Sequence, residues 1–137
     1  MNVAQQRAAR AYGLVGVTTG VDTADPHGLV LMLFDGAIEA ISRARMHLDA
    51  GKVVEKGRAV SQAVLIVEQG LNASLDRSAG GALAATLTDL YDYIARRLLL
   101  ASAGNDRGGF DEALRLLSEL RAAWTAIPEN RRPGGAA

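Results

Sequence analysis

Apolar residues recur every three or four positions in four stretches of the chain, a spacing typical of amphipathic helices. We expect the first helix to begin at Asp25-Pro26, because aspartate caps free helix N–H groups and proline is tolerated in the first turn. It closes at Ala50-Gly51, since glycine readily adopts the left-handed conformation that ends many helices. The apolar stripe of this predicted helix consists of Val30, Phe34, Ala37, Ile41, Ala44 and Leu48.

Three further stretches repeat the pattern, and short breakers separate them. The second stripe consists of Val60, Val64, Val67, Leu71 and Leu75, beside which lie the small residues Ala59, Ala63 and Gly70. The third consists of Leu83, Leu87, Leu90, Ile94 and Ala101, and the fourth of Phe110, Ala113, Leu117, Leu120, Trp124 and Ile127. Residues 76–81 and 105–109 interrupt the periodicity, and Pro128 ends it.

Four helices joined by short connections are typical of an all-α fold, the antiparallel up-and-down four-helix bundle. No part of the chain alternates strictly between apolar and polar residues, so no strand is predicted. The sequence divides into an N-terminal arm over 1–24, the bundle over 25–127 and a disordered tail over 128–137. Prolines and glycines in the tail deny its backbone a regular structure.

Length, charge and composition narrow the class of protein. A chain of 137 residues has the usual size of one domain. Its 15 basic and 15 acidic residues cancel, which argues against nucleic-acid binding, and the lack of cysteine excludes disulfides and thiolate sites. The N-terminus lacks the apolar core of a signal peptide, and no apolar run approaches the roughly 20 residues of a membrane span. We therefore expect a cytoplasmic protein without membrane insertion.

The sequence offers little catalytic chemistry. The two histidines, His27 and His47, lie about 30 Å apart along the first predicted helix, so they cannot share a metal ion. The Glu-x-x-His pairs of di-metal bundles are missing. We expect no enzyme and no catalytic, cofactor or metal site. One alternative from another class remains, a histidine phosphotransfer bundle using His47, although no lysine lies on the preceding turns to stabilise a phosphate.

The chain is 49% hydrophobic, more than one stripe per helix requires. At 100° per residue, the apolar residues that fall beside or opposite the stripes are Leu31, Met32, Ile38, Met46, Leu65, Ile66 and Leu99. Such residues either thicken the core or form grooves for an amphipathic helix of another chain, a role that suits flexible methionines. The pattern alone leaves both interpretations open.

A more specific signal comes from ordered blocks of sequence. Ala11-Tyr12 followed by residues 21–37 resembles the N-terminal signature of the FliS family of flagellar export chaperones. Residues 71–76, 80–83 and 90–98 resemble the central block of that family, and Trp124 lies where its members tend to place a tryptophan. The resemblance keeps its order from about residue 11 to residue 127. A modest departure is Phe34, which stands where tyrosine is common.

The resemblance implies a non-catalytic cytoplasmic chaperone without a cofactor. It would bind the C-terminal segment of newly made flagellin, prevent premature polymerisation and present it to the flagellar type III export apparatus. On this basis the predicted partner-binding residues are Tyr12, Leu14, Leu31, Met32, Ile38, Leu65, Ile66 and Leu99. In the arm, Tyr12 either anchors the segment by packing or covers a groove that flagellin later occupies. Weak self-association of the free protein through the same grooves is also left open.

Overall fold

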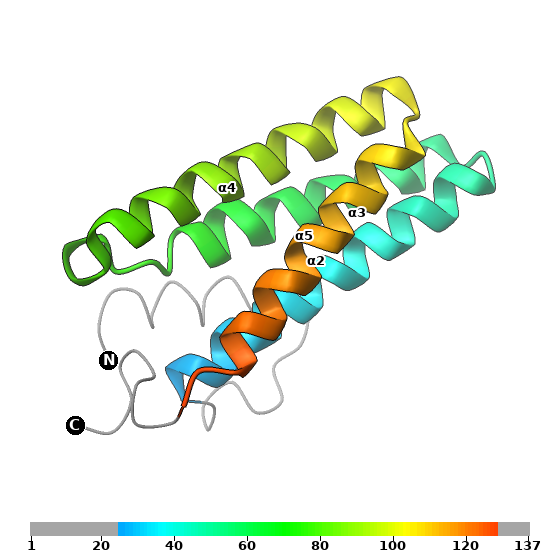
Figure 1. Ribbon diagram of the computed structural model, residues 1–137. Helices are drawn as coiled ribbons and strands as arrows, with labels where there is room; N and C mark the ends of the chain where they lie inside the picture. The colour runs from blue at the N-terminus through cyan, green and yellow to red at the C-terminus, as the bar shows by residue number, and fades with distance from the viewer. Residues whose placement is uncertain (1–24, 129–137) are drawn as a thin grey trace.

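In the computed structural model, which describes residues 25–128, four helices pack side by side (Figure 1). They are α2 (Pro26–Asp49), α3 (Val53–Leu65), α4 (Arg77–Gly104) and α5 (Arg107–Thr125), and a short π-helix, η1 (Ile66–Asn72), continues α3. Each helix runs back along the one before it, and α5 packs against both α4 and α2, which closes the ring. The described residues contain no strand, and the predicted all-α antiparallel bundle is confirmed. The predicted arm over 1–24 and residues 129–137 of the predicted tail lie outside this range.

The ends of α2 are closed by the residues that the sequence indicated. Asp25 is extended, and its carboxylate accepts a hydrogen bond from the Gly28 amide at 2.7 Å, while Pro26 occupies the first turn. At the other end the chain turns at Gly51, whose φ is 72° and whose amide donates to the Leu48 carbonyl at 3.1 Å. Both predicted ends of this helix are therefore confirmed.

The core lies between the four helices, and small residues bring α2 and α3 close together. Ala37 and Ala40 of α2 and Ala59 and Ala63 of α3 are all buried. These two helices form the most extensive contact of the bundle, because alanine side chains allow their backbones to approach closely. The largest fully buried side chains are Phe34, Phe110, Leu29, Leu33, Ile41, Ile66, Leu71, Ile94, Leu98, Leu117 and Val67.

The core face of α3 and η1 contains the predicted stripe, of which Val60, Val67 and Leu71 are buried, and it is wider than that stripe. It also takes in Ala59 and Ala63, which the sequence placed beside the stripe, and Ile66, which follows them by seven and three positions and so lies on their side of the helix. Ile66 is 1% exposed and belongs to the core cluster, so for this residue the structure favours the thicker core over a groove, and little of its surface is open to the predicted partner. The small residues noted in the sequence thus belong to the buried face of α3 and η1.

The start of α4 contains a kink. Gly81 has φ 54° and ψ −127°, a conformation that glycine adopts at little cost. Residues 77–81 of the breaker predicted over 76–81 therefore lie inside the helix range, at its kink. Beyond the kink, the buried face runs through Ala84 and Tyr91, seven positions apart. Leu83 was predicted to be buried, but it lies beside this face and is 67% exposed.

Candidate partner-binding groove

A groove of about 570 Å³ lies between α3 with η1 on one side and α4 on the other. Its lining residues are Val64, Glu68, Asp89, Asp92, Ala95, Arg96 and Leu99, and we call it the α3–α4 groove. Both walls contribute apolar surface, Val64 from α3 and Ala95 and Leu99 from α4. The groove opens to solvent, because Asp89, Arg96 and Leu99 are exposed. Its shape and lining suit the apolar side of a helix that carries some charge.

Two of the leucines predicted to bind a partner lie on these two helices. Leu99 lines the groove and is 51% exposed, and Leu65, which follows Val64 in α3, is 39% exposed. Leu100 is also exposed, beyond Leu99. The core-facing positions of both helices are already occupied by other apolar residues, so these leucines find no place inside the bundle. They offer apolar surface that the described chain leaves uncovered.

An acidic pair lies at one wall of the groove. Glu68 of η1 stands beside Asp92 of α4, and the side-chain amide of Asn72 donates to Asp92 Oδ1 at 3.1 Å. Burial raises the pKa of the Glu68 carboxyl; the neighbouring Asp92 carboxyl raises it further, whereas a hydrogen bond with Asn72 lowers it. One Glu68 carboxyl oxygen is buried and has no hydrogen-bond partner among the described residues. The pair therefore has unused capacity to accept hydrogen bonds.

A buried lysine fixes the relative position of the two helices that form the groove. Lys56 of α3 is 5% exposed, and its ammonium donates to the Ser102 carbonyl of α4 at 2.8 Å and to the Asn105 side-chain oxygen. Asn105 has a φ of 51° just after the end of α4. The ammonium thus satisfies a terminal carbonyl of the helix and holds the turn that follows it.

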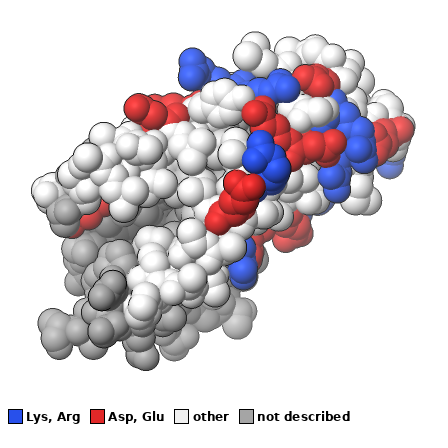
Figure 2. Space-filling model, viewed as in Figure 1, with Lys and Arg blue, Asp and Glu red and all other residues white. Residues whose placement is uncertain are grey.

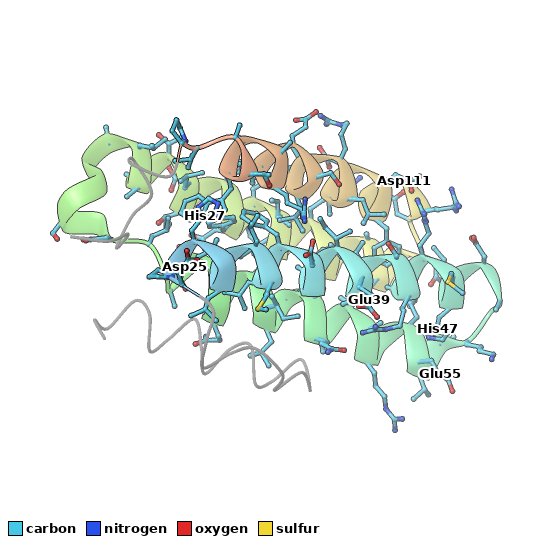
Figure 3. All side chains as sticks on the ribbon, turned by 90° about the horizontal axis from the view of Figure 1, so that it is seen from below. Asp25, His27, Glu39, His47, Glu55 and Asp111 are labelled. Atoms are coloured by element: carbon cyan, nitrogen blue, oxygen red, sulfur yellow. The ribbon has the colours of Figure 1, made fainter. Side chains whose placement is uncertain are left out.

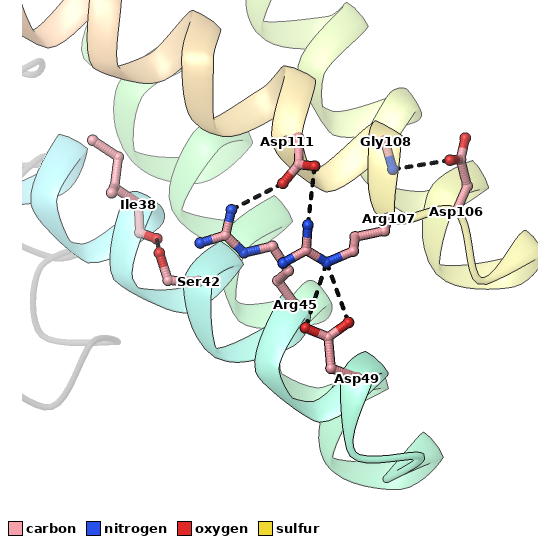
Figure 4. A network of polar contacts seen from close by, with 8 residues as sticks. All are labelled: Ile38, Ser42, Arg45, Asp49, Asp106, Arg107, Gly108 and Asp111. Atoms are coloured by element: carbon pink, nitrogen blue, oxygen red, sulfur yellow. Dashed lines mark hydrogen bonds and ion pairs between the residues drawn. The ribbon is translucent and has the colours of Figure 1, made fainter.

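Many charged side chains elsewhere are paired within the bundle. Arg107 of α5 donates to Asp49 at 3.2 Å and to Asp111 at 3.5 Å, and Arg45 of α2 donates to Asp111 at 2.9 Å (Figure 4). Figure 2 shows charged side chains gathered over the end of the bundle where α5 begins, whereas the surface over the first turns of α4 is mostly uncharged. These partly exposed pairs join α5 to α2, and each adds little stability by itself.

A second polar cluster joins α4 to α5. The Tyr93 hydroxyl donates to Glu112 Oε2 at 2.9 Å, and Arg97 Nε donates to Glu112 Oε1 at 2.8 Å. Arg97 also donates to Asp106 at 3.1 Å. The hydrogen bond from Tyr93, followed by that from Arg97, holds the pKa of Glu112 below its ordinary value. Both oxygens of this carboxylate thus accept hydrogen bonds from the chain, whereas one Glu68 oxygen has no partner among the described residues.

The predicted binding residues of α2 lie at the edge of the core, away from the α3–α4 groove. Leu31, Met32 and Ile38 are half-buried, and the last two pack against the core cluster. Met32 was expected nearly opposite the core stripe, but α2 packs against both α3 and α5, which together cover a wide arc of its surface. Tyr12 and Leu14 lie outside the described residues.

Sequence reasoning missed the polar part of the groove. Glu68 follows Val64 by one helical turn, and Asp89 and Asp92 are one turn apart on α4, so their spacing places each set on one face. That spacing was a usable signal for a charged face on each helix. It contained no information that the two faces adjoin, because this depends on how α3 and α4 rotate as they pack.

The two histidines do not come together in the described chain. His27 and His47 lie at opposite ends of α2 (Figure 3). His27 stacks on Trp124 with ring centroids 4.9 Å apart, and Trp124 donates to its carbonyl at 3.1 Å. Within residues 25–128, no three His, Cys, Asp or Glu side chains gather in a way that could hold a metal ion. The same range contains no helix that is long and apolar enough to cross a membrane.

Comparison with known proteins agrees with the resemblance found in the sequence. Residues 8–131 match the family model described as flagellar protein FliS. The flagellar secretion chaperone FliS of Salmonella typhimurium is 48% identical over 118 residues, which is 86% of this chain and 87% of the relative. FliSB of Pseudomonas aeruginosa is 35% identical over 88% of this chain and 95% of its own length, and FliS of Bacillus subtilis is 31% identical over 82% of each. These matches show that the chain belongs to the FliS family, a family of flagellar secretion chaperones and not of enzymes.

Proposed function

We propose that the protein is a cytoplasmic export chaperone that binds the C-terminal segment of flagellin. In this role it prevents premature polymerisation and delivers flagellin to the flagellar type III secretion apparatus. The observation that carries the proposal is the open α3–α4 groove, on a bundle whose relatives are named flagellar secretion chaperones. Such a chaperone needs no catalytic group, because covering a polymerisation surface requires binding alone.

The groove supports this proposal through its shape and its exposed leucines. An amphipathic helix would place apolar side chains against Val64, Ala95 and Leu99, and it would extend over the neighbouring Leu65. Burial of apolar surface is worth about 25 cal/mol per Å², before the costs of association and of ordering the helix are subtracted. A segment that contacts several such surfaces at once is therefore held more tightly than one helix in one groove.

The remaining predicted contacts form the second part of the proposal. Flagellin wraps around the bundle and also meets Leu31, Met32 and Ile38 of α2, which have part of their surface accessible. Tyr12 and Leu14 of the arm, which lie outside the described residues, are the further contacts that we propose for flagellin. Weak self-association of the free protein would use the same surfaces and would compete with flagellin.

Isothermal titration calorimetry with a peptide of the flagellin C-terminal segment from the same organism tests the proposal. We expect a one-to-one complex, and we expect the full-length flagellin to co-purify with the chaperone. A peptide from the N-terminal segment of the same flagellin serves as the control and is expected to bind much more weakly. Failure of the C-terminal segment to bind would overturn the proposed function.

A further inference from the structure

The α3–α4 groove is not uniformly apolar, and its charge is unbalanced. Its lining includes the carboxylates of Glu68, Asp89 and Asp92 against the single guanidinium of Arg96. Elsewhere, carboxylates such as Glu112 and Asp111 receive hydrogen bonds from arginines of the chain. The groove therefore has an acidic surplus beside its apolar surface, which neutral apolar binding does not require.

The position of Glu68 indicates where a positively charged group would bind in the groove. One of its carboxyl oxygens is buried without a hydrogen-bond partner among the described residues, and Asp92 lies next to it. Two adjacent carboxyls repel each other when both are ionised, and their partial burial weakens the screening by water. A donor with a positive charge would satisfy the open oxygen and relieve the repulsion together. A metal ion is a poor candidate, because within residues 25–128 no cluster with enough ligands exists.

We propose that the α3–α4 groove recognises a helical segment with a basic side chain, arginine or lysine, on its apolar side, and that this side chain pairs with Glu68 and Asp92. This inference rests on the proposed function, in that the segment belongs to the flagellin C-terminal region. Val64, Ala95 and Leu99 contact the apolar side chains that flank the basic one. The acidic pair then fixes the register of the helix in the groove, because an apolar surface alone would allow the helix to slide.

The backbone of η1 explains why the carboxylates of Glu68 and Asp92 lie together in the α3–α4 groove. Glu68 belongs to η1, the π-helical turn that follows α3, and Asn72 at the end of the same turn donates to Asp92. That hydrogen bond holds Asp92 toward η1, beside Glu68. A π-turn carries an extra residue compared with an α-turn, and such turns are frequent at functional sites. The two carboxyls are thus placed together by the backbone of η1 and by one amide.

Calorimetry with the C-terminal flagellin peptide tests the inference on the full chain. Glu68→Gln keeps the shape of the side chain and removes its charge, and Asp92→Asn does the same on α4. The matched control is Glu55→Gln, which makes the same change at an exposed position of α3 outside the groove. We expect Kd to rise at least about tenfold for Glu68→Gln and for Asp92→Asn, the loss typical of a hydrogen bond to a charged group, and to change less than about twofold for the control.

A second set of peptides identifies the basic residue. Each arginine or lysine of the segment is replaced by glutamine in turn, and each peptide is titrated into the wild type and the Glu68→Gln protein. One replacement is expected to weaken binding to the wild type and to abolish the difference between the two proteins, as coupled partners do. Circular dichroism should show that Glu68→Gln melts no lower than the wild type, so that weaker binding cannot come from unfolding.

The outcomes separate this inference from the proposed function. If the unmodified peptide binds the wild type but Glu68→Gln and Asp92→Asn bind it equally well or more tightly, the occupant is neutral at this point and the inference is wrong. The same conclusion follows if no basic residue of the peptide is coupled to Glu68. If the unmodified peptide fails to bind the wild type at all, the proposed function itself is wrong.

Discussion

Replacement of Lys56 by methionine is expected to destabilise the bundle substantially. Methionine keeps most of the apolar stem and removes the ammonium, which donates to the Ser102 carbonyl and to the Asn105 side chain. Hydrogen bonds from a charged donor contribute about 1.5–3 kcal/mol each, and burial of the ammonium offsets part of that gain. A net loss of about 2 kcal/mol in the free energy of unfolding follows.

The chain offers a matched control four residues earlier. Lys52 is exposed just before α3, and Lys52→Met is expected to change the free energy of unfolding by less than about 0.5 kcal/mol. Thermal melts followed by circular dichroism should place Lys56→Met about 6–12 °C below the wild type and Lys52→Met within about 2 °C of it. Equal melting temperatures for the two variants would refute the assignment of Lys56 as the residue that holds α4 against α3.

Three further changes are expected to act as follows. Leu99→Asp should weaken binding of the flagellin peptide at least about tenfold in calorimetry with a nearly unchanged melt, whereas Ile66→Asp should unfold the protein, since a buried carboxylate costs several kcal/mol. In urea denaturation, Gly109→Ala should lower the free energy of unfolding by about 1–3 kcal/mol, because its Cβ would lie 2.4 Å from a side-chain carbon of α4. Gly57→Ala should raise that free energy by about 0.5–1 kcal/mol, because its Cβ would meet nothing within 4 Å. Folding lowers the pKa of Glu112, so its contribution to stability is present above the unfolded-state pKa and is lost as the pH falls through the folded-state value. The stability difference between the wild type and Glu112→Gln should therefore shrink as the pH is lowered from about 7 to about 3 in urea titrations.

Each of these changes has a result that would contradict its reasoning. A large drop in melting temperature for Leu99→Asp would show that this leucine belongs to the core. Equal stability of the Gly109→Ala and Gly57→Ala proteins would contradict the close approach of α4 and α5 at Gly109. A stability difference for Glu112→Gln that grows as the pH falls would contradict the lowered pKa of that carboxyl.

The fold was predictable because periodicity and helix ends act locally. Asp25 caps α2 and Gly51 ends it, as the sequence indicated, and neither depends on the rest of the chain. The four-helix order follows from the short breakers between the stripes. Leu65 and Leu99 fall to one side of their stripes in the sequence, and both are exposed in the structure.

The errors arose where packing decides which side of a helix is buried. Ile66 is buried because the core face of α3 and η1 is wider than the predicted stripe. Leu83 is exposed because the buried face of α4 beyond the kink at Gly81 runs through Ala84 and Tyr91 instead. The π-turn of η1 has no sequence signature in this chain, yet it places Glu68 beside Asp92. Lys56 is another case, since its burial depends on the end of α4, which lies far away in sequence.

The most direct test of the account is a site-specific photo-crosslink between the groove and flagellin. A benzophenone amino acid in place of Leu99 lies in the α3–α4 groove, and the same amino acid in place of Arg115 lies on the exposed surface of α5. Irradiation with the C-terminal flagellin peptide, followed by mass spectrometry, should crosslink the Leu99 position at an apolar stretch next to the basic residue that couples to Glu68. Little crosslinking is expected from position 115. A crosslink from position 115 with none from position 99 would contradict the claim that flagellin binds in this groove.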